Sequence, residues 1–367
     1  MNGRTPAMRL ALLGDGESPH LLKWARALSA EGVDLWAASS RGFAPAFDEV
    51  LPSARRLALG TRPDFDGGNA AVLRTLPRLA RWLRAVQPDW VHAHYLTSHG
   101  TLAWLAQSWL GAPGRIVGSA WGSDILVTPQ RHAAMRWLTR RVLRACTLTT
   151  SDSQHMAGRM QALGAREVMT FPFGLDAMPP APASKDGMLF FANRGLEPIY
   201  APERVIDAFG AVASQWPAAR LVVANDGSLR AALQARADAA GLAGRVRFTG
   251  RLDAQAQAGW YARARWYLSL PRSDSVSVSV LEAMAHGCVP ILSDLPANRE
   301  LVRHGDNGCL LADGALPDAA QLQALAARAD AVAGDNRAWV AEHALFGPCV
   351  RRFVDRLVSL ADAPALP

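Results

Sequence analysis

Short apolar runs rich in β-branched residues alternate along the chain with longer stretches of helical spacing. In the first half they predict strands at 8–13, 33–38, 89–94, 115–120, 146–151 and 167–171, and helices at 18–30, 70–86, 97–110, 132–145 and 152–163. Such alternation is typical of βαβ units, in which helices cover both faces of a mostly parallel sheet.

The same alternation restarts after an interruption rich in proline and small residues at 176–187. Strands are predicted at 188–192, 220–224, 246–249, 266–270 and 289–292, and helices at 203–214, 228–240, 254–263, 279–286, 318–332 and 348–361. We therefore predict two doubly wound α/β domains that face a cleft, over 1–177 and 188–345, joined by a linker at 178–187. The segment 346–367 is predicted to be a C-terminal helix that packs back toward the first domain. Ligands of such sheets bind outside the carboxyl ends of the strands.

Composition agrees with a folded chain of two domains. The 367 residues are 50% hydrophobic and 19% charged, which disfavours disorder. No apolar run approaches the ~20 residues that a membrane helix needs. The first residues have no small-residue cleavage site, so we expect a short leader into a buried strand and not a secretory signal. The four cysteines are scattered, which disfavours a disulfide framework or a zinc site and fits a reduced cytoplasm.

The charge of the chain is unevenly distributed. Residues 1–180 contain 20 Arg and Lys against 13 Asp and Glu, whereas the remainder is balanced. A basic half indicates an anionic partner, such as nucleic acid, a phospholipid surface or a phosphorylated acceptor. Lys23 and Lys185 are the only lysines, and no Gly-Lys-Ser/Thr tripeptide exists. This excludes the kinases and ATPases that use a P-loop.

The loop after the first strand contains two glycines, Gly14 and Gly16, and leads into a helix. Glycines let a backbone approach a phosphate, and a helix N-terminus attracts an anion. Pro19 stands where a dinucleotide fingerprint needs its third glycine, which excludes a standard NAD site. A plain turn with Ser18 as helix cap explains this loop equally well.

Two further candidates lie at strand ends in the first half. Asp124 follows the strand at 115–120, where it can serve a ligand or simply cap a helix. His92 and His94 alternate along one strand and share a face. A hydrogen-bonded core pair is favoured over a metal site, because no third ligand is spaced nearby. We predict neither a bound metal nor a cofactor.

The most informative segment is SLPRSDSVSVSVLEAMAHGCVPILSD at 269–294. A buried strand ends in a serine-rich turn, and a short helix then carries Glu282. Ser275, Ser277 and the amides before this helix can surround a diphosphate. A carboxylate within an apolar helix is costly unless strong donors reach it, and a ribose diol supplies two. The alternative is that Glu282 faces solvent.

These residues resemble family 4 of the retaining GT-B glycosyltransferases. Asp274, seven further residues, Glu282 and Ala-Met-Ala follow the family pattern Glu-Gly-Phe-Gly-Leu-Pro-x-x-Glu-Ala-Met-Ala. The segment 222–252 is similar to the family's Gly-Asp-Gly-x-Leu-Arg segment and its Val-x-Phe-x-Gly strand. The segment 192–209 is similar to the one that carries the donor-phosphate Arg. The resemblance is strong over 187–311 and collinear over 8–175, and it implies two Rossmann-like domains.

The chain departs from this family pattern at four places. Asp274 is one methylene shorter than the family's Glu, and Ser-Val-Ser at 275–277 replaces Gly-Phe-Gly. Tyr200 stands where the family has Lys, and Trp121 where it commonly has His. Arg194 is then left to supply positive charge, with Arg204 or Arg272 as alternatives. These changes predict an altered sugar pocket or a weakly active or inactive enzyme.

The resemblance implies transfer of a sugar from a UDP, GDP or dTDP sugar to a glycan or lipid-linked acceptor, with retention, in bacterial surface-glycan or glycolipid assembly. Arg194, Asp274 and Asp124 are the implied catalytic residues. The implied donor-binding residues are Gly14, Gly16, Arg194, Arg272, Asp274, Ser275, Val276, Ser277 and Glu282. Two alternatives are a nucleotide-sugar epimerase on the same fold and a non-catalytic partner of membrane glycan assembly. Nucleic acid is not an expected partner.

A basic helix in the first half bears on where the protein acts. Residues 131–144 place Arg136, Arg140 and Arg144 on one helical face with Arg141 beside them, and the segment 76–86 repeats the theme. One interpretation is an ordinary surface helix. The other is a face that docks on anionic lipid and so reaches a lipid-linked acceptor. We therefore predict a cytoplasmic protein, which under the second interpretation is peripheral on the inner face of the cytoplasmic membrane.

Overall fold

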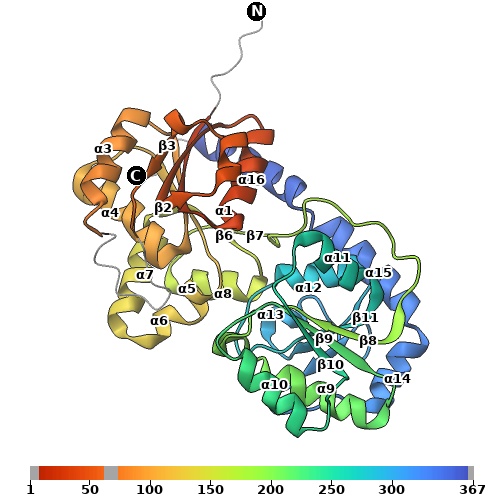
Figure 1. Cartoon of the computed structure of the whole chain (residues 1–367). Helices are drawn as coiled ribbons and strands as arrows, with labels where there is room; N and C mark the ends of the chain where they lie inside the picture. Colours follow the sequence, from red (N-terminus) through yellow and green to blue (C-terminus); the bar gives the residue numbers. More distant parts are fainter. Residues whose placement is uncertain (1–7, 62–72, 363–367) are drawn as a thin grey trace, which may run out of the picture. The chain divides into compact units, whose positions relative to one another are not determined.

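The computed structural model describes residues 8–61 and 73–362 and divides them into two compact units. Unit 1 contains the described residues up to Phe171 together with those from Phe346 onward, and unit 2 spans Pro172–Leu345. Each unit has one parallel sheet with helices packed against it (Figure 1). The predicted fold class, α/β with two doubly wound Rossmann-like domains, is confirmed.

The sheet of unit 1 has the strand order β3-β2-β1-β4-β5-β6-β7. Its strands are β1 (Arg9–Gly16), β2 (Asp34–Phe43), β3 (Arg56–Ala58), β4 (Trp90–His94), β5 (Arg115–Ser119), β6 (Cys146–Ser151) and β7 (Val168–Thr170). All pairings are parallel, and β1 lies between β2 and β4. Residues 10–13 of β1 are buried because helices cover both of its faces. The carboxyl ends of these strands therefore present the loops after β1, β2, β4 and β5 at one edge.

The helices of unit 1 include one from the far end of the chain. They are α1 (Pro19–Ala30), α3 (Leu76–Val86), α4 (Thr101–Leu110), α5 (Ser123–Leu126), α6 (Thr128–Arg131), α7 (Ala133–Ala145), α8 (Gln154–Leu163) and α16 (Phe346–Asp362), with short 3₁₀ turns at Pro45–Glu49 and Ser53–Arg55 and a π-helical turn, η3, at Tyr95–Gly100. Figure 1 shows α16 beside α1. Trp24 of α1 packs edge-on against Phe346 and Phe353 of α16, which anchors the C-terminal helix in this unit.

Unit 2 has the sheet order β10-β9-β8-β11-β12-β13, in which the strand order reverses between β8 and β11. Its strands are β8 (Asp186–Ala192), β9 (Arg220–Ala224), β10 (Val246–Gly250), β11 (Ala264–Ser269), β12 (Val289–Ser293) and β13 (Cys309–Leu311). Its helices are α9 (Glu203–Gln215), α10 (Arg230–Ala239), α11 (Ala254–Arg263), α12 (Val278–Ala285), α13 (Pro296–Arg299), α14 (Ala319–Ala327) and α15 (Ala329–His343), with a 3₁₀ turn, η4, at Pro198–Tyr200. Apolar clusters cover both faces of this sheet.

Several predicted elements differ from the structure at their ends. The helix predicted at 318–332 is two helices, because the backbone at Arg328 leaves the helical region with φ of −124°. The first residues of the helix predicted at 97–110 belong to the π-helical turn η3, and the α-helix α4 begins only at Thr101. Of the helix predicted at 70–86, residues 70–72 lie outside the described residues, and α3 begins at Leu76. The three-residue strands β3 and β13 were not predicted, whereas β7, of the same length, was.

Among the described residues, no helix combines the length and the apolar character needed to cross a membrane.

Candidate active site

Arg194 brings together three of the residues that the sequence singled out in unit 2. It lies two residues beyond the end of β8, at the carboxyl edge of the sheet. One terminal nitrogen, Nη2, lies 2.7 Å from Oδ2 of Asp274, and Nη1 donates a hydrogen bond to the Ser277 hydroxyl. The guanidinium also lies 4.5 Å from the centre of the Tyr200 ring, a cation–π contact. Tyr200 therefore contacts the cation and does not supply a second one.

Asp274 and the serine-rich turn directly precede helix α12. The Asp274 carboxylate accepts a hydrogen bond of 3.0 Å from the Ser275 amide, and Ser275, Val276 and Ser277 are buried. Burial raises the pKa of Asp274 above its usual value, although Arg194 and the Ser275 amide act in the opposite direction. The turn thus joins one cation, one carboxylate and a helix N-terminus within hydrogen-bonding distance.

The two alternative arginines lie in different surroundings. Arg204 donates to the carbonyls of Leu270 and Pro271, so its guanidinium fastens the end of β11. Arg272 is about two-thirds exposed and pairs with Glu203 at 3.5 Å. In the described geometry Arg194 is the arginine that touches the turn before α12.

Glu282 lies on α12 and is half-buried. Its Oε2 accepts a hydrogen bond of 3.1 Å from the Tyr261 hydroxyl and a longer one of 3.4 Å from the Gln257 amide. The carboxylate is therefore held by side chains of α11 and does not simply face solvent. Tyr261 and Gln257 were not found from the sequence, because nothing local marks them; their approach to Glu282 results from the packing of α11 on α12.

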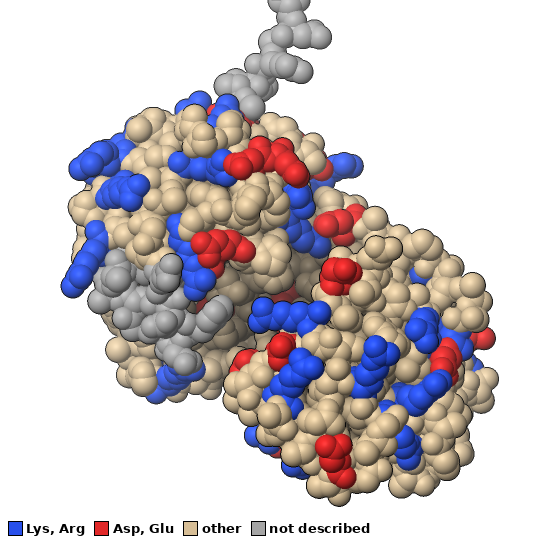
Figure 2. Space-filling model, in the orientation of Figure 1, with Lys and Arg blue, Asp and Glu red and all other residues tan. Residues whose placement is uncertain are grey.

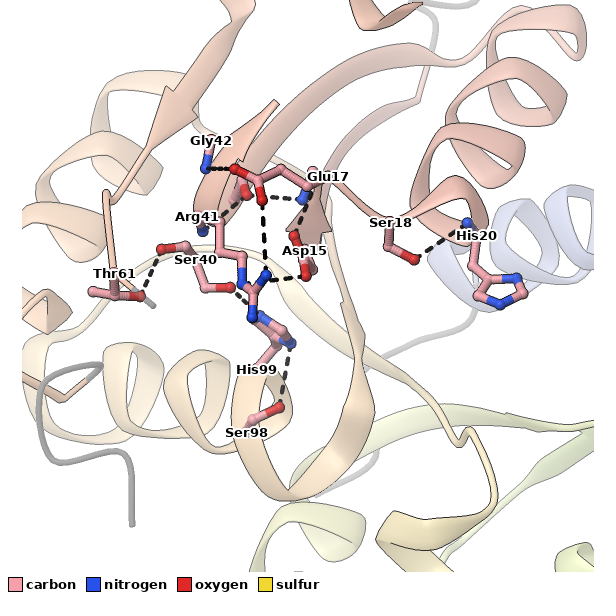
Figure 3. A network of polar contacts seen from close by, with 12 residues as sticks. Asp15, Glu17, Ser18, His20, Ser40, Arg41, Gly42, Thr61, Ser98 and His99 are labelled. Carbon is pink, nitrogen blue, oxygen red and sulfur yellow. Dashed lines mark hydrogen bonds and ion pairs between the residues drawn. The ribbon is translucent and has the colours of Figure 1, made fainter. Parts of the chain in front are cut away.

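In unit 1 the loop after β1 is held by its own hydrogen bonds. The Gly16 amide donates to the Ser39 hydroxyl at 2.8 Å, the Glu17 amide to Oδ1 of Asp15, and the Ser18 amide to the Asp15 carbonyl. Figure 3 shows this loop with the groups that surround it. Ser18 also caps α1 by accepting from the His20 amide. These amides already have partners within unit 1.

A side chain at either glycine of this loop would collide with neighbouring atoms. A Cβ at Gly16 would lie 2.5 Å from the Gly42 carbonyl oxygen, and one at Gly14 would lie 2.5 Å from a methyl group of Leu21. The first collision is with backbone and cannot be relieved by a side-chain rotation. The close approach of β1 to β2 therefore requires glycine at 16 with or without a ligand.

Arg41 is a charged residue of this edge that the sequence did not reveal. It follows the buried part of β2, and its guanidinium lies 3.6 Å from Asp15 and 3.7 Å from Glu17 (Figure 3). Beside it, His99 of η3 uses Nε2 to contact the Ser40 hydroxyl at 2.9 Å and Nδ1 to contact the His94 carbonyl at 2.7 Å. These groups come from three separate segments, so no sequence spacing marks the cluster.

Asp124 lies at the same edge, at the start of the short helix α5, and is buried. Its two oxygens accept 2.9 Å hydrogen bonds from the amides of Leu96 and Trp121. Burial raises its pKa to about 6, and those amides act against the rise. Trp121, at the position of the family's usual His, donates from its indole to Nδ1 of His94 at 3.2 Å. Asp124 thereby ties the loops after β4 and β5 together.

The two histidines of β4 face the interior of unit 1. His92 bonds to the Ser119 hydroxyl at 2.7 Å, and its ring centre lies 4.5 Å from that of His94. Burial lowers the pKa of His92 to about 3 and that of His94 well below its usual value, so both are neutral. Within the described residues, no cluster of three or more His, Cys, Asp or Glu side chains could hold a metal ion.

The basic residues of α7 are exposed as a group. Arg136, Arg140, Arg141 and Arg144 line a shallow depression together with Trp137, while Val142 and Leu143 are buried on the opposite face. Trp137 is 53% exposed and lies under the Arg141 guanidinium at 5.4 Å. Figure 2 shows basic side chains spread over the visible face of unit 1.

Comparisons with known proteins agree with this geometry. The family model "Glycosyl transferases group 1" matches residues 186–330, and the model "Glycosyl transferase 4-like" matches residues 9–153. Together the two models cover most of the chain, which belongs to the glycosyltransferases that they describe. The matched segments include Arg194 and Glu282 in one unit and the β1 loop and Asp124 in the other.

Sequence relatives of this glycosyltransferase include mycobacterial enzymes. A phosphatidyl-myo-inositol mannosyltransferase of Mycobacterium tuberculosis is 32% identical over 162 residues, which is 42% of this chain and 42% of that relative's length. The enzyme of the same name from Mycobacterium leprae is 27% identical over 83% of this chain and 82% of its own length.

Solved structures resemble this glycosyltransferase over nearly its whole length. Anabaena HepE in complex with UDP has a TM-score of 0.73 with 14% identity, covering 96% of this chain and 100% of that one. Sucrose-phosphate synthase from Thermosynechococcus elongatus has a TM-score of 0.74 with 15% identity and the same coverage. At these identities the likeness establishes the fold.

Proposed function

We propose that this glycosyltransferase moves a sugar from a nucleoside-diphosphate sugar to an acceptor with retention, and that the donor binds unit 2 beside Arg194. The observation that carries the proposal is the contact of Arg194 with Asp274 and Ser277 at the N-terminus of α12. A diphosphate there would meet a cation, a hydroxyl and the positive end of a helix. HepE, a structural neighbour, was solved with UDP, which supports a nucleotide donor.

Each residue of the cluster has a role in this proposal. Glu282 accepts hydrogen bonds from the ribose hydroxyls of the donor. Arg194, with the buried turn 275–277, stabilises negative charge as the glycosidic oxygen leaves; such preorganised donors are worth several kcal/mol. Asp274 contacts hydroxyls of the transferred sugar, and the departing phosphate takes the proton of the acceptor. Roles for Arg272, Gly14, Gly16 and Asp124 stay predictions.

We further propose a lipid-linked or glycan acceptor reached from an anionic membrane surface. Exposed arginines beside an exposed tryptophan on α7 are typical of helices that lie at a lipid interface. On the neighbouring helix α4, Trp104 packs edge-on against Trp137 with ring centres 6.3 Å apart. The mycobacterial relatives carry names that denote mannosyl transfer to phosphatidyl-myo-inositol, which supports a lipid acceptor.

Incubation with a panel of UDP, GDP and dTDP sugars tests the proposed activity. We expect release of one nucleoside diphosphate that requires an acceptor, and a product whose anomeric configuration by NMR equals that of the donor. A new nucleotide sugar formed without acceptor would identify an epimerase instead. Absence of any turnover with intact folding would favour a non-catalytic partner of membrane glycan assembly.

A further inference from the structure

A chain of buried polar side chains lies directly behind Glu282. It begins with Tyr267 on β11, continues through Asn193 at the end of β8, and reaches Tyr261 on α11. The Tyr267 hydroxyl donates to Oδ1 of Asn193 at 2.8 Å, and Nδ2 of Asn193 donates to the Tyr261 hydroxyl at 2.7 Å. The chain ends at the Glu282 carboxylate, 3.1 Å from the Tyr261 hydroxyl.

The direction of these hydrogen bonds determines where the Tyr261 hydroxyl can donate its proton. Its hydroxyl already accepts from Asn193, so its single proton is left to donate. The two acceptors within reach are Oε2 of Glu282 and the Ser279 carbonyl, each at 3.1 Å. An ionised carboxylate is the stronger acceptor of the two. Burial raises the pKa of Tyr261 far above its usual value, so the phenol keeps this proton throughout the physiological range.

The ring that carries this hydroxyl is fixed by its neighbours. Phe191 packs edge-on against the Tyr261 ring with centres 5.0 Å apart, and His286 stacks on it at 5.5 Å. The side chain is about 1% exposed, so the hydroxyl cannot swing into solvent. The second donor to Glu282, Gln257, lies farther away at 3.4 Å and is only half-buried.

We infer that Tyr261 is a positioning residue that fixes the Glu282 carboxylate for the ribose hydroxyls of the donor. The inference rests on the proposed function, because it presupposes that Glu282 binds the nucleotide. A carboxylate held in one orientation before binding loses less conformational freedom when the ligand arrives. Asn193 precedes Arg194 in the chain, so the same network joins the ribose-binding and phosphate-binding groups of the site.

Titration calorimetry with UDP, and with GDP and dTDP if UDP does not bind, tests the inference on Tyr261→Phe. Loss of a hydrogen bond to a charged group predicts a Kd about tenfold higher. Tyr267→Phe is the matched control: it also removes one buried hydroxyl that bonds to Asn193, but this hydroxyl donates to Asn193 and not to the Glu282 carboxylate. For this control we expect a fall in Tm similar to that of Tyr261→Phe, but a change in Kd of less than about twofold.

A double-mutant cycle separates positioning from structural support. In a Glu282→Gln background, Tyr261→Phe should change Kd by less than about twofold, because the charged acceptor is already gone. An equal tenfold loss in both backgrounds, or an unchanged Kd for Tyr261→Phe in the wild-type background, would overturn the inference. If the wild-type protein binds none of the three nucleotides, the proposed function itself fails.

A fluorine label keeps the inference testable if Tyr261→Phe does not fold. 3-Fluorotyrosine placed at 261 retains the hydroxyl, and its ¹⁹F resonance reports the hydrogen bond. The resonance should shift when UDP is added and also when Glu282 is replaced by Gln. A resonance that responds to neither change would show that the Tyr261 hydroxyl and the nucleotide are not coupled.

Discussion

Arg194 combines a partly buried ion pair with a position at the N-terminus of a helix, and the two together argue for a role in leaving-group stabilisation. Asp274, Ser277 and the Tyr200 ring hold the guanidinium in place before any ligand binds. A donor whose position is fixed in advance costs no reorganisation when charge develops. We therefore propose that one rigid arginine serves where the family pattern has an arginine and a lysine.

Arg194→Ala should lower turnover more than donor affinity. Charge on the diphosphate grows only as the glycosidic bond breaks, so the lost interaction is largest in the transition state. We expect kcat to fall about 100-fold or more, with a smaller rise in KM, measured by nucleotide release. Arg251→Ala, an exposed residue of the same unit, is the control. A rise in KM with kcat unchanged would reassign Arg194 to anchoring the ground state.

Glu282→Ala should abolish most donor binding without unfolding the protein. The carboxylate is half-buried, and Tyr261, one of its partners, retains the Ser279 carbonyl as an acceptor, so little is left unsatisfied. Two hydrogen bonds to a charged group are worth roughly 2–4 kcal/mol, which predicts an affinity at least about 30-fold weaker. Calorimetry and a thermal melt measure the two quantities. Unchanged affinity together with a lower Tm would show that Glu282 serves the fold.

At the scale of elements, β4 and η3 carry three buried neutral histidines that make unit 1 sensitive to acid. Burial lowers the pKa of His92 to about 3, that of His99 to about 4 and that of His94 well below its usual value. A lowered folded-state pKa contributes stability that is present above pH ~6.5 and lost as the pH falls toward the folded value. Asp124, with a pKa raised to about 6, has the opposite sign.

Near pH 5 the three histidines and Asp124 together bind about two more protons in the unfolded state than in the folded state. The free energy of unfolding of unit 1 should therefore fall by roughly 2.7 kcal/mol for each unit by which the pH decreases around pH 5. Hydrogen exchange of the β4 amides at pH 5, 6 and 7 measures this. His99→Gln should reduce the slope by about one proton, or ~1.4 kcal/mol per pH unit. Stability that is independent of pH over this range would contradict the buried, neutral state of the three rings.

Helix α7 offers the test of membrane association. Arg136, Arg140 and Arg144 are exposed, and each basic residue near an anionic surface contributes ~1 kcal/mol. The triple substitution to Ser should therefore release the protein from vesicles of phosphatidylcholine with phosphatidylglycerol in a sedimentation assay, and salt should do the same to the wild type. A matched triple substitution of exposed residues of unit 2, Arg247, Arg251 and Arg263, should not. A wild-type protein that stays in the supernatant at low salt would point to a soluble acceptor.

For the whole molecule, patterning along the chain predicts the fold because long buried strands leave a strong signal. Strands such as β1 and β8 and amphipathic helices such as α9 agree with the prediction to within a few residues. The three-residue strands β3 and β13 do not show in the pattern, since their pairing depends on a neighbouring strand that is already in place. At the break between α14 and α15, the Arg328 side chain bonds to the Gly305 carbonyl, a partner far away in sequence.

The candidate site was predictable only where its chemistry is local. Asp274, Ser277 and Glu282 lie within one short segment, so their spacing could be compared with a family pattern, and Arg194 followed from a second segment. Tyr261 and Arg41 could not be found this way. Each acts on a group far away in sequence, Tyr261 on Glu282 and Arg41 on Asp15, and such pairs become visible only when the helices and strands are assembled.

The central claim is that the nucleotide part of the donor binds unit 2 at the edge formed by β8 and α12. Hydrogen exchange with mass spectrometry, with and without saturating nucleoside diphosphate, tests it most directly. We predict slower exchange in peptides that cover 186–200 and 270–286, and loss of that protection in Glu282→Ala. Protection confined to unit 1, or protection in unit 2 that leaves both of these segments unchanged, would contradict the account.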